Sequence, residues 1–132
     1  MLVIKHFLNG FADYRRERDM YIHLKKSACD DLVLNLLEQD DEFKILVMER
    51  GICDLRTFAE LRREQDNPDG PLSAGEILLV LEYIANAMHR LWTHAKLCLC
   101  DMKEQNILIK YSAEGLGGYK PILTDLGAAY CK

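Results

Sequence analysis

The sequence predicts an α+β fold whose strands and helices are segregated into two parts. Short apolar runs typical of strands dominate the first 51 residues, and a long amphipathic helix dominates the remainder. The chain has 132 residues, of which 49% are apolar and 29% are charged. This composition is typical of a globular protein with one hydrophobic core, and it excludes a disordered segment.

The first part of the chain is expected to form a small sheet and one helix. Residues 2–5 predict a strand, and residues 11–26 predict a helix because apolar side chains recur there at helical spacing among many charged ones. Residues 32–37 and 43–48 are strand-like runs. The polar residues 38–42 between them indicate the turn of a β-hairpin.

The second part is expected to be mostly helical. Residues 55–63 predict a short helix, and the turn-forming residues 66–71 predict a loop. Ser73 and Glu76 have the spacing of a capping box, in which each side chain satisfies a backbone amide of the other. The helix that follows has an apolar stripe that can bury one face, formed by Ile77, Leu81, Ile84, Met88 and Leu91.

Charge and cysteine content exclude several classes of protein. The formal net charge of -4 gives no reason to expect a nucleic-acid partner, which usually requires a basic face. No apolar run reaches the roughly 18 residues of a membrane helix, so we expect no membrane partner and a cytoplasmic location. The five cysteines have irregular spacing, which argues against a disulfide framework. Cys98 and Cys100 have no second Cys/His pair nearby, so zinc is disfavoured.

Polar residues that could take part in catalysis or metal binding gather late in the chain. Asp101, Lys103 and Asn106 precede an apolar strand, and Asp125 follows a second one after a Gly-rich turn at residues 112–118. A hairpin of these strands would bring Asn106 and Asp125 to one end, where two oxygen ligands would suit Mg²⁺. Asp101 would lie close enough to take or orient a hydroxyl proton, and Lys103 could neutralise charge on a transferring phosphoryl group.

With these motifs the sequence resembles the eukaryotic protein kinase family. The run from Leu99 to Asn106 matches the catalytic-loop signature H-R-D-x-x-x-x-N, and Asp125-Leu-Gly127 matches D-F-G. Upstream, Val3-Ile-Lys5 matches the end of the V-A-I-K strand, and Tyr14-Arg-Arg-Glu17 matches the helix glutamate that pairs with that lysine. The run from Leu46 to Gly51 is similar to the strand that enters the hinge. The resemblance covers nearly the whole chain in the family's order.

The resemblance implies a protein serine/threonine kinase core with ATP and Mg²⁺ as cofactors. Lys5, paired with Glu17, would hold the α- and β-phosphates, and backbone groups from Glu49 to Gly51 would bind adenine. The lysine two residues after the catalytic aspartate is the serine/threonine pattern. The implied fold has a partial small lobe at residues 1–51, with a three-stranded antiparallel sheet and one helix. The first part of the helical large lobe would be residues 52–132.

The same resemblance assigns the catalytic loop and the metal ligands. Asp101 would be the catalytic base, assisted by Lys103, and Asn106 and Asp125 would hold Mg²⁺. The family's Gly-rich loop, activation loop and later helices have no counterpart in these 132 residues. We therefore expect a partner chain or further segments to cover the exposed core, beside an unidentified protein substrate.

Two alternatives stay open. The family's His-Arg pair is replaced by Leu99-Cys100, which favours a pseudokinase or kinase remnant that binds a nucleotide or another protein. Kinase-like small-molecule phosphotransferases share the catalytic aspartate, the asparagine and the later metal-binding aspartate. The Asp125-Leu-Gly127 segment and Lys103 lean towards a protein kinase instead.

Overall fold

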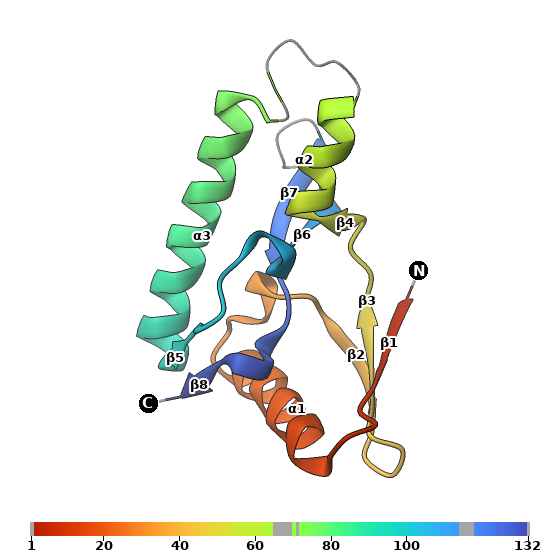
Figure 1. Ribbon diagram of the computed structural model, residues 1–132. Coiled ribbons are helices and arrows are strands. Elements are labelled where there is room, and N and C mark those ends of the chain that lie inside the picture. The colour runs from red at the N-terminus through yellow and green to blue at the C-terminus, as the bar shows by residue number, and fades with distance from the viewer. Residues whose placement is uncertain (1, 65–69, 71, 114–117, 132) are drawn as a thin grey trace.

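The computed structural model describes residues 2–64, 70, 72–113 and 118–131 (Figure 1). These residues form helices α1 (Phe11–Lys26), α2 (Leu55–Glu64) and α3 (Ala74–Ala95), together with three small antiparallel sheets. The predicted α+β class is confirmed. The loop expected at 66–71 lies outside the described residues except for Gly70 and Leu72 beside it, and most of the turn at 112–118 also lies outside them.

The first sheet has the order β1-β3-β2, with strands β1 (Leu2–His6), β2 (Leu36–Asp40) and β3 (Ile45–Glu49). All neighbours are antiparallel. Helix α1 follows β1 directly and lies beside this sheet in Figure 1. The predicted three-stranded sheet with one helix is therefore present in the first part of the chain.

The hairpin of β2 and β3 is confirmed, but its turn lies further along the chain than predicted. Asp40 Oδ1 accepts hydrogen bonds from the backbone N–H groups of Glu42 and Phe43, both at 2.9 Å. An aspartate side chain used in this way starts a tight turn. Residues 38–40, predicted as part of the turn, therefore belong to β2.

The apolar run before β2 is not the strand that its composition predicts. Leu32 ends a short 3₁₀ turn, η1 (Asp30–Leu32). Val33 forms an isolated parallel bridge with Leu123, and the N–H of Leu34 donates to the Leu123 carbonyl at 2.9 Å. This run crosses to the second half of the molecule, where Leu32, Val33 and Leu34 are all buried.

The second sheet has the order β4-β6-β7, with strands β4 (Cys53–Asp54), β6 (Ile107–Tyr111) and β7 (Tyr119–Leu123). A third pair joins β5 (Leu97–Cys98) to β8 (Tyr130–Cys131). Two further 3₁₀ turns, η2 (Glu104–Asn106) and η4 (Leu126–Ala128), flank the β6–β7 hairpin. The predicted late hairpin is confirmed.

Helix α3 begins at the predicted capping box. The Ser73 hydroxyl accepts from the Glu76 backbone N–H at 3.2 Å, and the Glu76 carboxylate accepts from the Ser73 N–H at 2.8 Å. The helix ends at Ala95, after which Lys96 adopts a left-handed conformation with φ 52°. The capping box therefore marks the start of the helix, and the left-handed residue marks its end.

The burial predicted for α3 is only partly correct. Leu91 is fully buried and Ile84 packs against the core, but the other members of the predicted stripe, Ile77, Leu81 and Met88, are exposed. The buried face instead includes Ala87 and Ala95, whose small side chains allow close approach. Along the residues with described structure, no helix is long and apolar enough to cross a membrane.

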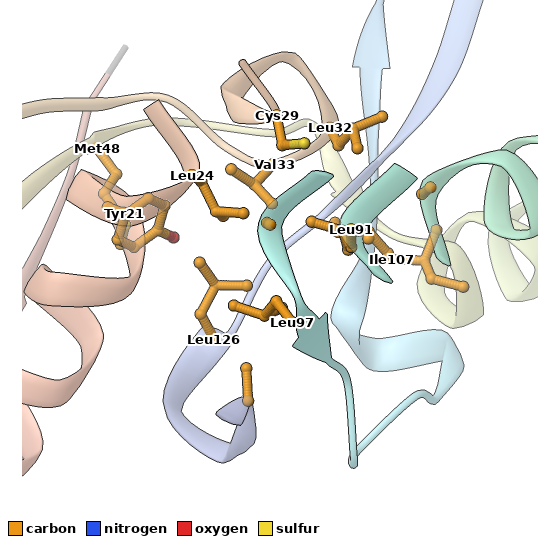
Figure 2. Close-up of a cluster of buried hydrophobic side chains, with 14 residues drawn as sticks. Tyr21, Leu24, Cys29, Leu32, Val33, Met48, Leu91, Leu97, Ile107 and Leu126 are labelled. Atoms are coloured by element: carbon orange, nitrogen blue, oxygen red, sulfur yellow. The ribbon is translucent and has the colours of Figure 1, made fainter. Parts of the chain in front are cut away.

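One hydrophobic cluster connects the two parts of the chain (Figure 2). Helix α1 contributes Tyr21 and Leu24, helix α3 contributes Leu91, and the turn after β7 contributes Leu126. Their side chains point towards one another in Figure 2. The cluster is continuous from α1 to α3, so the packing of each helix depends on the other. Its remaining fully described members are Cys29, Leu32, Val33, Met48, Ala87, Ala95, Leu97, Ile107, Leu123 and Ala129.

Replacement of Leu91 tests this packing. Leu91→Ala is expected to lower the free energy of unfolding by about 2–5 kcal/mol, because it leaves a cavity in the cluster. Leu78→Ala on the exposed face of the same helix is the matched control and should change it by less than about 0.5 kcal/mol. Urea denaturation followed by circular dichroism measures both. Equal effects of the two substitutions would contradict the described burial.

Candidate functional site

An ion pair with a buried carboxylate joins β1 to α1. Lys5 Nζ lies 2.6 Å from Glu17 Oε2, and the Glu17 side chain is only 3% exposed. Glu17 is brought to this position because it shares the inward face of α1 with Tyr14, Tyr21 and Leu24, which recur at spacings of three and four residues. The pairing of Lys5 and Glu17 predicted from the sequence is present.

Burial dominates the electrostatics of Glu17. Desolvation raises the pKa of its carboxyl group, the Lys5 ammonium opposes that rise, and the Asp125 carboxylate adds to it. The net direction is upward, so the charged form of Glu17 is less favourable in the folded protein than in water. Lys5 therefore only partly compensates this buried charge.

Asp125 approaches the same lysine from the turn after β7. Its Oδ1 lies 3.9 Å from Lys5 Nζ and accepts a long hydrogen bond from the Gly127 N–H at 3.4 Å. Asp125 has a left-handed backbone, with φ 61° and ψ 76°. The next residue, Leu126, is fully buried in the hydrophobic cluster and anchors the turn. Three segments far apart in the sequence thus supply Lys5, Glu17 and Asp125.

A second group of polar residues surrounds Asp101. The buried Asn106 side chain donates from Nδ2 to the Asp101 carbonyl at 2.9 Å and lies 3.4 Å from Asp101 Oδ2. Lys103 Nζ lies 2.9 Å from the same Oδ2, and this contact raises the pKa of Lys103. The structure therefore brings together the predicted catalytic-loop residues Asp101, Lys103 and Asn106.

Pairing of β6 with β7 joins these two groups. Ile107 pairs with Leu123, and just beyond this pair the Thr124 N–H donates to the Asn106 carbonyl at 3.0 Å. Asn106 and Asp125 consequently leave the hairpin at the same end. This backbone arrangement is the one that the sequence analysis predicted for the two residues.

Glu49 and Gly51 lie apart from these groups. Lys5 pairs with Leu46, whereas Glu49 is three residues further along β3, which is about 10 Å at strand spacing. The Glu49 backbone N–H donates to the Asn35 carbonyl at 3.0 Å, and its carboxylate lies 2.5 Å from Lys110 Nζ. A Cβ at Gly51 would lie 3.0 Å from Leu108 Cβ, so a side chain at this position would require Leu108 to shift.

Tyr21 is a neighbour of the site that the sequence analysis placed only in the helix pattern. It lies one helical turn after Glu17 on the same face of α1, and its side chain is buried. The spacing of four residues from a predicted site glutamate was the available signal.

The donor set contains too few acidic side chains for a metal site formed by the protein alone. Within the described ranges, no three His, Cys, Asp or Glu side chains come together as metal ligands. Asn106 and Asp125 would therefore have to share a metal with a bound ligand or water, as Mg²⁺ sites commonly do.

No protein-family model matches the chain, and no curated protein matches it.

The raised pKa of Glu17 predicts a pH dependence of stability. Its folded-state pKa lies above the unfolded value, so its contribution to stability is complete below the unfolded pKa and is lost as pH rises through the folded pKa. Glu17→Gln removes this titration. The stability of the variant relative to wild type should therefore increase from about pH 4 towards pH 7.

Urea denaturation of both proteins across that pH range measures the difference. Glu60→Gln, at an exposed position on α2, is the control and should follow wild type within about 0.5 kcal/mol. A Glu17→Gln variant whose stability relative to wild type falls as pH rises would contradict the raised pKa.

Proposed function

We propose that this chain is the nucleotide-binding and catalytic core of a protein serine/threonine kinase, which transfers a phosphoryl group from Mg·ATP to a protein hydroxyl. The observation that carries the proposal is the position of Lys5, 2.6 Å from Glu17 and 3.9 Å from Asp125. These three residues are the ones to which the family resemblance assigns phosphate and metal binding.

Asn106 and Asp125 fit the requirements of Mg²⁺ binding. Because Asn106 Nδ2 is held by the Asp101 carbonyl, the amide presents its oxygen in another direction. The Asp125 side chain is 50% exposed and so is accessible to a ligand. Amide and carboxylate oxygens are hard donors of the kind that Mg²⁺ prefers. When bound, the ion would neutralise charge on the phosphates.

The protein's own charges can act on the rest of the nucleotide. The Lys5 ammonium would bind the α- and β-phosphates, and Glu17 would hold it in place because the buried carboxylate has Lys5 as its cation. Backbone groups from Glu49 to Gly51 would contact adenine. The Glu49 N–H is already bonded to Asn35, so carbonyl groups or later N–H groups would serve.

Asp101 and Lys103 would act on the acceptor hydroxyl and the phosphoryl group. The Asp101 carboxylate is 47% exposed, so a substrate hydroxyl can reach it and transfer or share its proton. Lys103 contacts the same carboxylate and would stabilise negative charge that develops nearby. Both residues lie on the loop between β5 and η2, beside Asn106.

A nucleotide-binding module without phosphotransfer is the second candidate. It is favoured by Leu99, which packs against the hydrophobic cluster where the family has a histidine, and by the exposed Cys100 where it has an arginine. In that case Lys5, Glu17, Asn106 and Asp125 would keep their roles, and Asp101 would have none in catalysis.

Thermal unfolding tests nucleotide binding. Millimolar Mg·ATP should raise the apparent stability of the wild-type chain, by about 1.4 kcal/mol when the ligand concentration is ten times Kd. Asp125→Asn should abolish most of this gain. Asp19→Asn, on an exposed acid of α1 outside the site, should retain it. If Mg·ATP stabilises neither wild type nor Asp19→Asn, the chain has no nucleotide function.

Phosphate transfer tests the catalytic role. Asp101→Asn is expected to lower label transfer from ATP to a generic basic protein by about 100-fold or more, with Mg·ATP stabilisation retained, because it removes a general base. Transfer by wild type to choline or aminoglycosides, but not to protein, would favour a small-molecule phosphotransferase. Binding by wild type without any transfer would favour the nucleotide-binding module.

A further inference from the structure

The hydroxyl group of Tyr21 is buried without a hydrogen-bond partner among the residues that the structure describes. Its side chain is 5% exposed. Buried hydroxyl groups almost always have a protein or water partner, because an unpaired one loses its hydration without replacement. An unpaired hydroxyl next to a candidate site therefore indicates a contact that the protein side chains alone do not supply.

The position of Tyr21 relates it to the charged residues of the site. It lies four residues after Glu17, so the two side chains share one face of α1. Figure 2 shows the hydroxyl oxygen directed into the cluster, on the side where Leu126 lies. Leu126 immediately follows Asp125, so the hydroxyl is directed towards the turn that carries this carboxylate.

The charges of Glu17 and Asp125 both act on this hydroxyl. The pKa of Tyr21 is raised, first by burial and then by the charges of Glu17 and Asp125. A phenol with a raised pKa stays protonated at neutral pH, and it acts as a donor towards negative groups. Tyr21 therefore offers a further donor to the two acidic side chains, beside Lys5 at Glu17 and the Gly127 N–H at Asp125.

Gly127 lies beside the same two carboxylates and presents no side chain to them. A Cβ at this position would lie 3.4 Å from Asp125 Oδ1 and 3.9 Å from Glu17 Oε2, and among the described residues outside its chain neighbours it would meet no other atom within 4 Å. A buried water needs two to four polar partners. Two carboxylate oxygens and a phenol donor form such a set.

We propose that Tyr21 is a positioning residue of the nucleotide site, whose hydroxyl donates through one bound water to the Glu17 and Asp125 carboxylates. The water would donate its two hydrogens to the carboxylates and accept from the tyrosine. This bridge fixes helix α1 relative to the Asp125 turn, and it thereby holds Lys5 and Asp125 in their binding arrangement. The positioning role rests on the proposed nucleotide-binding function.

Tyr21→Phe tests the bridge, because it removes only the hydroxyl. Its affinity for Mg·ADP, measured by isothermal titration on the full chain, should fall about three- to tenfold, which is the effect of one hydrogen bond. Tyr14→Phe is the matched control on the same helix. It also removes a buried phenol, but one that donates to Asp41 at 2.6 Å, away from the site, so affinity should not change.

Unfolding in urea without nucleotide separates the bridge from the proposed function. With the bridge, the effects of Tyr21→Phe and Glu17→Gln are non-additive, because both variants lose the same water. Additive effects, or a Tyr21→Phe variant that is more stable than wild type and binds Mg·ADP equally well, would overturn the inference. A wild-type chain that does not bind Mg·ADP overturns the proposed function and the positioning role, whereas the urea coupling still decides whether the bridge exists.

Discussion

A buried carboxylate governs the organisation of this molecule. Glu17 is almost fully removed from water, and its charge is opposed mainly by Lys5 at 2.6 Å. A buried charge without a partner is strongly destabilising, so β1 and α1 must keep their relative positions while Glu17 is ionised. The pair by itself is no argument for high stability, because desolvation offsets much of its attraction. The pair instead suits the nucleotide-binding role that we propose for Lys5.

The hydrophobic cluster transmits this constraint to the rest of the fold. Tyr21 and Leu24 lie on the same face of α1 as Glu17 and pack with Leu91 and Leu126. Leu126 anchors the turn that places Asp125 beside Lys5, and the β6–β7 hairpin places Asn106 at the same end of the hairpin as Asp125. Core packing and site geometry are therefore coupled, since one turn supplies both a buried leucine and a site aspartate.

The parts of the fold that the sequence predicted correctly are those specified by local rules. Helix α1, the Ser73–Glu76 capping box and the late hairpin follow from periodicity and turn chemistry over short distances. The predicted start of this strand, at residue 32, was wrong, because an apolar run has the same composition whether it pairs in a sheet or crosses the core. The burial of α3 was also misjudged, because Ile77, Leu81 and Met88 are exposed, and no periodicity reveals which neighbours a helix face has.

Site residues were predictable to a similar extent. The spacing of Asp101, Lys103 and Asn106 within one loop anticipated their mutual contacts, and strand pairing anticipated the approach of Asn106 and Asp125. The contact between Lys5 and Asp125 could come only from the family resemblance, since 120 positions separate them in the sequence. Tyr21 was missed as a site neighbour because its apolar ring fits the core pattern, and the hydroxyl matters only once the surroundings are known.

The central claim is that Lys5, Asn106 and Asp125 converge on one metal–nucleotide complex. Nuclear magnetic resonance with Mn·ADP in place of Mg·ADP tests it most directly, because the paramagnetic ion broadens signals only near its binding site. The account predicts that the backbone amides of Asn106, Asp125 and Gly127 broaden first and those of α2 stay sharp. Broadening centred on the acidic β2–β3 turn at Asp40 and Asp41, or none at all, would contradict it.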